Sequence, residues 1–178
     1  MQQKIVITGG PSSGKTTLIY ELEKRGYTCV HEVSRQITKK AQKEGIDQLF
    51  TSDPLLFSKL LLQGREQQYL DALEKRTSPI FFDRGIPEIH AYLDFFKTKY
   101  PKIYKEKSKT YRYDTVFLLP PWKEIHTTDK ERYEDFELSV SIFQYIKDAY
   151  TELGYTNIEV PFGSIKERTD FILHQLKL

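Results

Sequence analysis

The stretch IVITGGPSSGKTTL, residues 5–18, decides the fold that this sequence predicts. It begins with a β-branched apolar run, passes through a glycine-rich turn, and continues with leucine and isoleucine at helical spacing. Residues 9–16 match the pattern G-x-x-x-x-G-K-[ST], which is specific when a strand precedes it and a helix follows it. Since both conditions are met, we predict a strand, a phosphate-binding loop and a helix.

Each residue type in this loop suits a polyphosphate. Glycines let successive backbone N–H groups converge on phosphate oxygens, and the helix N-terminus adds a partial positive charge. Lys15 is expected to reach the β- and γ-phosphates, and the Thr16 hydroxyl to bind Mg²⁺. A plain glycine-rich turn is the alternative, but this composition yields the pattern by chance in about one per cent of cases. We therefore predict that a nucleoside triphosphate is bound by Gly9, Gly10, Pro11, Ser12, Ser13, Gly14, Lys15, Thr16 and Thr17.

The composition is that of an ordinary globular protein. The 178 residues fit one domain over 1–178, with 39% hydrophobic and 29% charged residues. A net charge of +2 is too small to predict a nucleic-acid or membrane surface. A single cysteine, Cys29, excludes an internal disulfide and a cysteine-based zinc site, and the four histidines lack metal-ligand spacing. No apolar run approaches the roughly 20 residues of a membrane span, so we expect a cytoplasmic protein without one.

Short apolar strands alternate with helical patterns along the chain. Strands are expected at residues 4–8, 27–31, 80–83, 114–119 and 157–160, and helices at 15–25, 33–45, 53–77, 87–96, 135–153 and 164–176. In the long third helix, the period is continued by Leu56, Leu60, Gln63, Gln67, Leu70 and Leu73. Such alternation indicates a parallel sheet covered by helices on both faces, which is the α/β fold class with three α/β/α layers.

Asp83 and Arg84 close the strand IFFD, residues 80–83. Open α/β sheets bind ligands beyond the carboxyl ends of their strands. Asp83 is therefore expected to hold Mg²⁺ through water or to accept a proton, and both residues join the predicted catalytic set. The alternative is an acid that caps the next helix, followed by a surface arginine.

Glu32 ends the second strand and precedes Arg35 by three residues. It is expected to face the same crevice, where it is a candidate general base for an acceptor hydroxyl. Phosphoryl transfer itself depends mainly on positioning and on neutralisation of charge. The alternative is a capping glutamate paired with Arg35 on the helix.

The polar stretch at residues 120–134 follows the fourth strand and is long enough to form a lid. Arg132 and Lys130 are expected to neutralise charge on the transferring phosphoryl group, as arginine fingers do. A solvated surface loop is the alternative, since most charge runs lie in solvent. Trp122 is either a hinge anchor or a core residue.

The loop VPFGS, residues 160–164, follows the last strand and can line a base pocket with backbone groups. Arg168 is expected nearby and is placed among the nucleotide contacts. Its alternative role is an arginine on the helix surface.

Taken in order, these segments resemble the P-loop kinase-like ATPase family, which includes AAA-type predicted ATPases and the nicotinamide-riboside kinase domain of bacterial NAD-biosynthesis regulators. The resemblance covers the whole chain. Only the first of its segments is specific by itself, and the others gain weight from their order and spacing. They are ITGGPSSGKTTL, HEVSR, FFDRG, LLPPW, the R-Y-E of residues 132–134, ELGY and IEVPFGSIKER.

The resemblance implies a five-stranded parallel sheet in the order 2-3-1-4-5, with the strand that ends at Asp83 beside the phosphate-loop strand. It also implies that Glu32 is the acid after the second strand, that Asp83-Arg84 is the acidic-arginine step, and that Arg132 is the lid arginine. The family's D-G-x-R lid pattern is replaced here by TDKER, residues 128–132, which leaves the acceptor open.

Two functions of different classes are compatible with the sequence. The first is a Mg²⁺-dependent kinase that moves the γ-phosphoryl of ATP to a hydroxyl of a small nucleoside-like or ribosyl acceptor. The second is an NTPase or regulatory module whose lid responds to ATP or GTP and contacts a partner through the tyrosine- and lysine-rich residues 98–114. That stretch is more often a solvated helix with core-facing tyrosines. ATP is preferred because no Asn/Thr-Lys-x-Asp guanine signature occurs, and the oligomeric state stays unknown.

Overall fold

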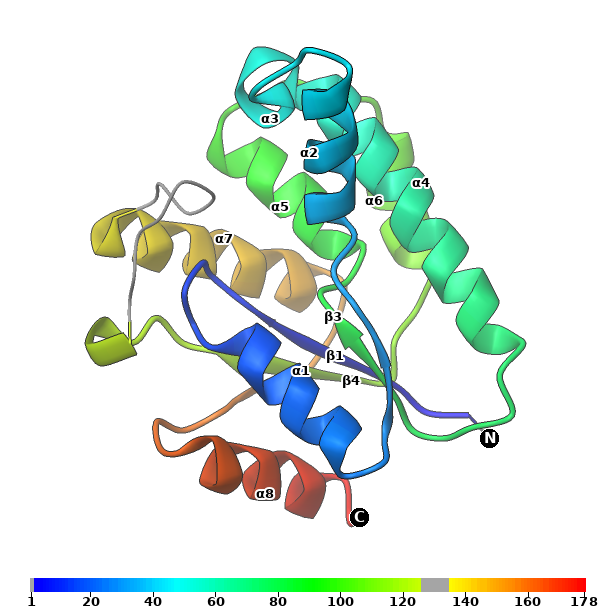
Figure 1. The fold of residues 1–178 in the computed structure, drawn as a ribbon, viewed down its shortest axis with the longest axis vertical. Coiled ribbons are helices and arrows are strands. Elements are labelled where there is room, and N and C mark those ends of the chain that lie inside the picture. Colours follow the sequence, from blue (N-terminus) through cyan, green and yellow to red (C-terminus); the bar gives the residue numbers. More distant parts are fainter. Residues whose placement is uncertain (1, 126–134) are drawn as a thin grey trace.

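A computed structural model describes residues 2–125 and 135–178, and it has three layers, with one sheet between two groups of helices (Figure 1). The sheet contains β1 (Lys4–Gly9), β2 (Thr28–Val30), β3 (Ile80–Asp83), β4 (Thr115–Leu119) and β5 (Asn157–Glu159). All neighbouring strands pair in parallel, in the order β2-β3-β1-β4-β5. The expected fold class and sheet order are confirmed.

The register of the central strands brings the chain's polar turns to one edge. Ile7 of β1 lies beside Asp83 of β3, and Gly9 of β1 lies beside Leu119 of β4. Because the strands are parallel, the loops that follow β1, β2 and β3 all leave from this carboxyl edge. The edge therefore gathers residues that are far apart in the sequence.

The helices follow the expected alternation, and the described residues add two α-helices, α3 (Leu49–Ser52) and α6 (Ile103–Thr110), and the short 3₁₀ helix η1 (Lys123–Ile125). The bounds of the expected helices are α1 (Lys15–Lys24), α2 (Ser34–Lys43), α4 (Pro54–Leu73), α5 (Pro87–Phe95), α7 (Phe136–Glu152) and α8 (Ile165–Gln175). The sequence predicted no helix at α3. At α6 the alternative of a helix with core-facing tyrosines is confirmed, because Tyr104 is buried. Within the described ranges, no helix combines the length and apolar character that crossing a membrane requires.

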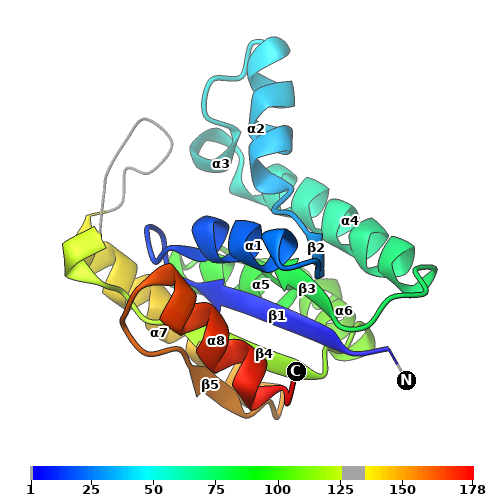
Figure 2. The ribbon, with the colours of Figure 1, turned by 60° about the horizontal axis from the view of Figure 1, so that its bottom comes forward.

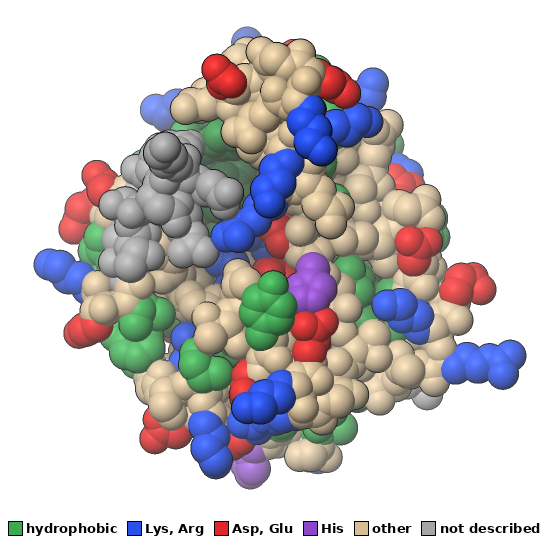
Figure 3. Space-filling view, viewed as in Figure 1, with side chains coloured by type: hydrophobic (Ala, Val, Ile, Leu, Met, Phe, Trp, Pro, Cys, Tyr) green, Lys and Arg blue, Asp and Glu red, His purple; other side chains and the backbone are tan. Residues whose placement is uncertain are grey.

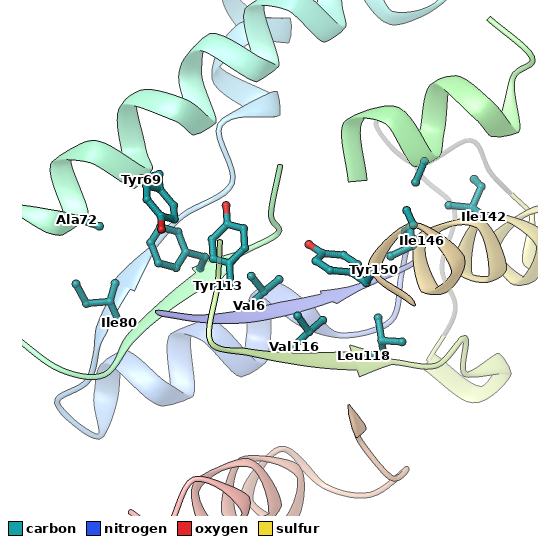
Figure 4. Packing of buried hydrophobic residues seen from close by; sticks show 13 residues of the cluster. Val6, Tyr69, Ala72, Ile80, Tyr113, Val116, Leu118, Ile142, Ile146 and Tyr150 are labelled. Atoms are coloured by element: carbon teal, nitrogen blue, oxygen red, sulfur yellow. The ribbon is translucent and has the colours of Figure 1, made fainter. Parts of the chain in front are cut away.

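Two apolar clusters hold the helices against the sheet. On one face, α1 and α8 cover Ile5 and Ile7 with side chains such as Leu18 and Ile172. On the other face, α4, α5 and α7 cover alternate strand residues, and Figure 4 shows Tyr150 of α7 beside Val6 and Val116. Strands buried on both faces explain the nearly continuous apolar runs in the sequence.

A third cluster lies beyond the carboxyl edge of the sheet and supports α2 and α3. Figure 2 shows these two helices standing away from the sheet, above α1. Apolar side chains of α2, α3, α4, α5 and α6, with Ile86 just before α5, pack together there, namely Ala41, Leu49, Phe57, Leu61, Leu62, Ile86, Ile89, Leu93 and Tyr104. We call α2 and α3 together the arm, because they reach over the edge where the loops meet.

Helix starts agree with the capping signals in the sequence. The Asp53 side chain accepts a hydrogen bond from the Leu56 amide at 2.9 Å, and Pro54 occupies the first turn of α4. Ser164 and Glu167 form a reciprocal capping box at the start of α8. The end of α4 was expected near residue 77, but the helix ends at Leu73.

The buried face of α4 differs from the one that the period suggested. Leu56, Leu60, Leu70 and Leu73 are between 37% and 48% exposed. The buried side chains are Phe57, Ser58, Leu61, Leu62, Arg65, Tyr69 and Ala72. Since α4 carries apolar residues on both sides, its periodicity does not discriminate between them, and long-range packing selects the face.

We predict that alanine substitutions on the two sides of α4 will distinguish its buried face from its exposed face. Leu62→Ala removes a side chain that is 7% exposed and is expected to lower the free energy of unfolding by about 2–4 kcal/mol. Leu60→Ala, on the exposed side, is expected to change it by about 0.5 kcal/mol or less. Urea denaturation measures both, and equal losses would contradict the observed orientation of the helix.

Candidate functional site

The loop between β1 and α1 has the backbone of a phosphate cradle. Ser12 and Gly14 adopt positive φ angles of 54° and 83°, a region that residues with a side chain rarely enter. A Cβ added to Gly14 would lie 2.7 Å from Nη1 of Arg168. Among the described residues, α1 has no side-chain N-cap and no acid in its first turn. Its first amides are therefore left to an acceptor from outside the helix.

Lys15 is buried against the loop that it follows. Its Nζ donates to the carbonyl oxygens of Gly9 at 2.9 Å and Gly10 at 2.5 Å, and to Ser13 Oγ at 3.1 Å. Burial, followed by the nearby positive charge of Arg84, lowers the pKa of Lys15 to about 7. The ammonium is thus held beside the cradle at a position where added negative charge would stabilise its protonated form.

Arg84 turns the chain at the end of β3 and faces the same loop. Its backbone N–H donates to Ile7 O at 3.0 Å, and its Nη1 donates to Gly9 O at 3.4 Å. Its φ angle of 73° lies in the left-handed region, an uncommon conformation for a residue with a side chain. The side chain is only 15% exposed, so the alternative of a surface arginine is wrong.

Asp83 is buried beside Lys15 and Arg84. It is 7% exposed, and within the described part of the chain its Oδ1 has no hydrogen-bond partner. Burial, followed by the negative charge of Glu32, raises the pKa of Asp83 above its ordinary value. An ionised carboxylate without a partner is unfavourable in such a place unless a cation joins it.

Glu32 is enclosed by two arginines. Arg84 Nε lies 2.6 Å from its Oε2, and Arg65 Nη2 lies 3.1 Å from both of its oxygens. The Ser34 amide donates to Oε1 at 3.1 Å, so Glu32 also contacts the backbone of the first residue of α2. Burial works to raise the pKa of Glu32, but the charges of Arg65 and Arg84 outweigh it and hold the pKa below the ordinary value.

Arg65 and Glu88 belong to this cluster and were missed from the sequence. Glu88 Oε2 pairs with Arg84 Nη1 at 2.7 Å, and its Oε1 accepts from the Gly85 amide. Arg65 Nη1 donates to the Gly85 carbonyl at 2.6 Å. Two features of the sequence could have indicated them. Arg84 and Glu88 are four residues apart, the spacing of an ion pair on a helix, and Arg65 is a cation four residues before Tyr69, on the same side of its helix.

Arg168 also lies against the loop, on the side opposite the arm. It is 2% exposed, and its Nη2 donates to Ser13 O at 3.0 Å. Within the described ranges, its Nε and Nη1 have no partner. Its guanidinium carbon lies 5.8 Å from the Trp122 ring, which stacks on Phe162 at 5.1 Å between centroids. The alternative of a helix-surface arginine is therefore wrong.

One cavity of about 580 Å³ connects the loop with the arm. Figure 3 shows the hollow beside α2, with Lys and Arg side chains along its rim. Its lining includes the charged residues Lys15, Glu32, Arg65, Asp83, Arg84 and Glu88, the arm residues Arg35, Thr38, Lys39 and Gln42, and the apolar residues Leu49, Phe50, Phe57, Leu61, Ile89 and Tyr92.

Part of the expected site lies outside the described residues. Arg132, Lys130 and the greater part of the expected lid fall within residues 126–134, which the structure does not describe. Of the stretch at 120–134, the described part ends with η1, whose Ile125 borders the cavity.

Comparison with known families identifies the chain. Residues 4–168 match the family model described as AAA domain. The chain belongs to this P-loop family. No curated protein sequence gave a significant match.

The solved structures with similar folds include two kinases and the NadR protein. Deoxyadenosine kinase from M. mycoides, with products dCMP and dCDP bound, aligns with a TM-score of 0.74 at 17% identity, over 98% of this chain and 99% of that chain. The NadR protein in complex with NR aligns with a TM-score of 0.74 at 15% identity, over 99% of this chain and 50% of that chain. Thymidylate kinase from Ehrlichia chaffeensis gives 0.67 at 13% identity, over 98% of each chain. At these identities the likeness shows the P-loop kinase fold.

We predict that Gly85 tolerates no side chain. A Cβ there would lie 2.4 Å from the Tyr150 hydroxyl and 3.1 Å from Tyr113, so Gly85→Ala is expected to destabilise the protein by about 1–3 kcal/mol. Adding Tyr150→Phe removes the nearest colliding atom and is expected to recover part of that loss. Thermal denaturation of the single and double variants measures the coupling, and strictly additive effects would argue against this contact.

Proposed function

We propose that this protein is an ATP- and Mg²⁺-dependent kinase that transfers the γ-phosphoryl group to a hydroxyl of a nucleoside-like or ribosyl small molecule. The observation that carries the proposal is the shared cavity, in which the phosphate cradle, an acid-and-arginine cluster and an apolar recess adjoin one another. Kinases of this fold need those three parts in contact.

The donor nucleotide is assigned to the loop side of the cavity. The amides at the start of α1, which no side chain of the described residues caps, and the buried Lys15 ammonium are suited to the triphosphate. In the part of the chain that the structure describes, Nε and Nη1 of Arg168 have no partner, which supports a further contact with the nucleotide, since a buried guanidinium normally finds acceptors for its protons. Trp122 and Phe162 offer a ring surface beside it.

The residues present fit a magnesium ion. Mg²⁺ prefers oxygen ligands and usually keeps several waters when it is bound with a nucleotide. Thr16 supplies a hydroxyl in the first turn of α1, and Asp83 supplies a buried carboxylate oxygen, Oδ1, that has no hydrogen-bond partner among the described residues. When bound, the ion would neutralise charge on the β- and γ-phosphates.

The acceptor is assigned to the recess under the arm. Phe50, Phe57 and Tyr92 line it, and Phe50 makes edge-to-face contacts with the other two at centroid distances of 5.4 and 6.4 Å. Aromatic walls suit a planar ring, and the polar side chains of Thr38 and Gln42 on α2 suit its hydrogen-bonding edge. This combination supports a nucleoside-like acceptor.

The reaction uses the charged cluster that lies between the two ligands. The acceptor oxygen forms a bond to the γ-phosphorus, the bond from that phosphorus to the bridging oxygen breaks, and ADP leaves. The acceptor proton passes to the Glu32 carboxylate, which its arginine partners keep ionised. Lys15 and Arg84 stabilise the negative charge on the transferring group and the leaving oxygen.

The proposal is tested by incubating the purified chain with ATP, Mg²⁺ and a panel of ribonucleosides, deoxynucleosides, nucleoside monophosphates and vitamin ribosides. Mass spectrometry is expected to detect one or more acceptors that gain a single phosphoryl group. ATP hydrolysis without transfer to any acceptor would contradict the proposed kinase function and favour the NTPase or regulatory alternative.

We predict opposite effects of Asp83→Asn on stability and on activity. Because the pKa of Asp83 is raised, its ionised form destabilises the fold above that pKa, and the penalty disappears as the pH falls below the unfolded value. At pH 7 the variant is expected to melt at a higher temperature than the wild type, while phosphoryl transfer falls on the order of 10²-fold. Asp148→Asn, on the exposed surface of α7, is the control and is expected to change neither quantity.

We predict that triphosphate affinity falls as the pH rises above 7. Lys15 loses its proton near pH 7 in the free protein, and bound phosphate favours the charged ammonium. Binding above that pH therefore takes up a proton, and the affinity drops by up to about tenfold per pH unit. Calorimetry in two buffers of different ionisation enthalpy measures the uptake. Lys15→Arg, which stays charged, is expected to abolish the dependence, and an unchanged slope would contradict the assignment.

A further inference from the structure

Arg65 is a buried cation on a helix whose other core-facing residues are mostly apolar. It is 5% exposed and lies on the face of α4 that carries Leu61, Leu62 and Tyr69. A buried guanidinium is strongly destabilising unless acceptors surround it. Its two terminal nitrogens meet most of that need, since Nη1 donates to Gly85 O at 2.6 Å and Nη2 donates to both oxygens of Glu32 at 3.1 Å. Its buried Nε has no hydrogen-bond partner among the described residues.

These contacts join three segments that are remote in the sequence. Glu32 follows β2, Gly85 follows the Asp83-Arg84 step of β3, and Arg65 comes from the middle of α4. The Gly85 carbonyl fixes one end of the guanidinium, so the other end presents its protons to Glu32 in a set direction. A single planar side chain thereby sets the position of the carboxylate relative to the turn that carries Asp83 and Arg84.

We propose that Arg65 is a positioning residue for phosphoryl transfer, which holds the Glu32 carboxylate in place and ionised toward the acceptor hydroxyl. The proposal rests on the proposed function, because it concerns the proton acceptor of that reaction. Arg65 acts through Glu32, whereas Arg84 also touches the phosphate loop through Gly9 O.

The charges around Glu32 make Arg65 hard to replace. Arg84 pairs with Glu32 but also pairs with Glu88 of α5, so its charge is shared between two carboxylates. Asp83 of β3 is a further nearby anion, and Lys15 of α1 a further nearby cation. Without Arg65, one shared arginine faces three carboxylates, and the proton affinity of Glu32 rises.

The first experiment compares Arg65→Met and Arg65→Lys with Lys59→Met, an exposed cation changed in the same way on the same helix. The Arg65→Met variant is expected to lose about 10–100-fold in kcat with the KM for ATP changed less than about threefold. The acid limb of its pH–rate profile is expected to move to higher pH. Arg65→Lys keeps the charge but not the fork that reaches Gly85 and Glu32, so it recovers part of both effects.

A double-variant cycle separates positioning from general damage to the fold. In a Glu32→Gln background, Arg65→Met is expected to reduce kcat by less than about twofold, because the group through which it acts is already changed. A merely structural role for Arg65 lowers the rate equally in both backgrounds and leaves the pH profile in place. Either of those results would overturn the proposal.

An activity-independent measurement keeps this inference separate from the kinase itself. Carbon-13 NMR of side-chain carboxyls in labelled protein follows the titration of Glu32, which is assigned by its loss in Glu32→Gln. The titration is expected to move to higher pH in Arg65→Met and to stay in place in Lys59→Met. If the Glu32 titration does not move in Arg65→Met, Arg65 has no such role, even if the protein is an active kinase. If the titration moves but no acceptor is phosphorylated, the proposed kinase function is wrong, while the effect of Arg65 on the Glu32 carboxylate stands.

Discussion

The whole site depends on the mutual compensation of six charges at one edge of the sheet, four of them buried and two, on Glu32 and Arg84, with side chains that are 15% exposed. Three cations, Lys15, Arg65 and Arg84, face three anions, Glu32, Asp83 and Glu88. Transfer of any one of them from water is strongly unfavourable, and only close partners offset that penalty. The pairing is complete around Glu32 and Glu88 and incomplete around Asp83, whose Oδ1 has no partner in the described part of the chain. The imbalance lies where a nucleotide and its metal ion are proposed to bind.

The parallel sheet is the reason that such a cluster forms. Placing β1 between β3 and β4 lets the turns after β1, β2 and β3 leave from one edge, and backbone contacts as close as that of Arg84 N with Ile7 O fix their spacing. Gly85 permits the tight approach of Tyr113 and Tyr150 beneath the turn. Helix α4 packs against this cluster through Arg65. In the described residues, Arg65 is the only side chain of that helix that hydrogen-bonds to both Glu32 and Gly85.

In the free protein, the charged forms of Lys15 and Asp83 are energetically unfavourable. Burial lowers the pKa of Lys15 to about 7 and raises the pKa of Asp83, so each charged form is less favourable than in water. Binding of a polyphosphate with a cation would relieve both penalties together. The charged forms of Lys15 and Asp83 therefore lower the stability of the free protein, and the charges of a bound ligand would restore it. Perturbed pKa values of this kind are common at functional sites.

The sequence by itself determined the phosphate loop, the strand-ending acids and the helix caps, because glycine spacing, short apolar runs and N-cap residues act locally. The sheet order came from a family resemblance, and residues 126–134 lie outside the described part, so Arg132 stays a prediction. Only tertiary structure decided which side of α4 is buried, and with it the place of Arg65. Leucines occupy both sides of that helix, so the choice depends on packing against other elements, namely β2, β3 and the arm, which no local pattern encodes.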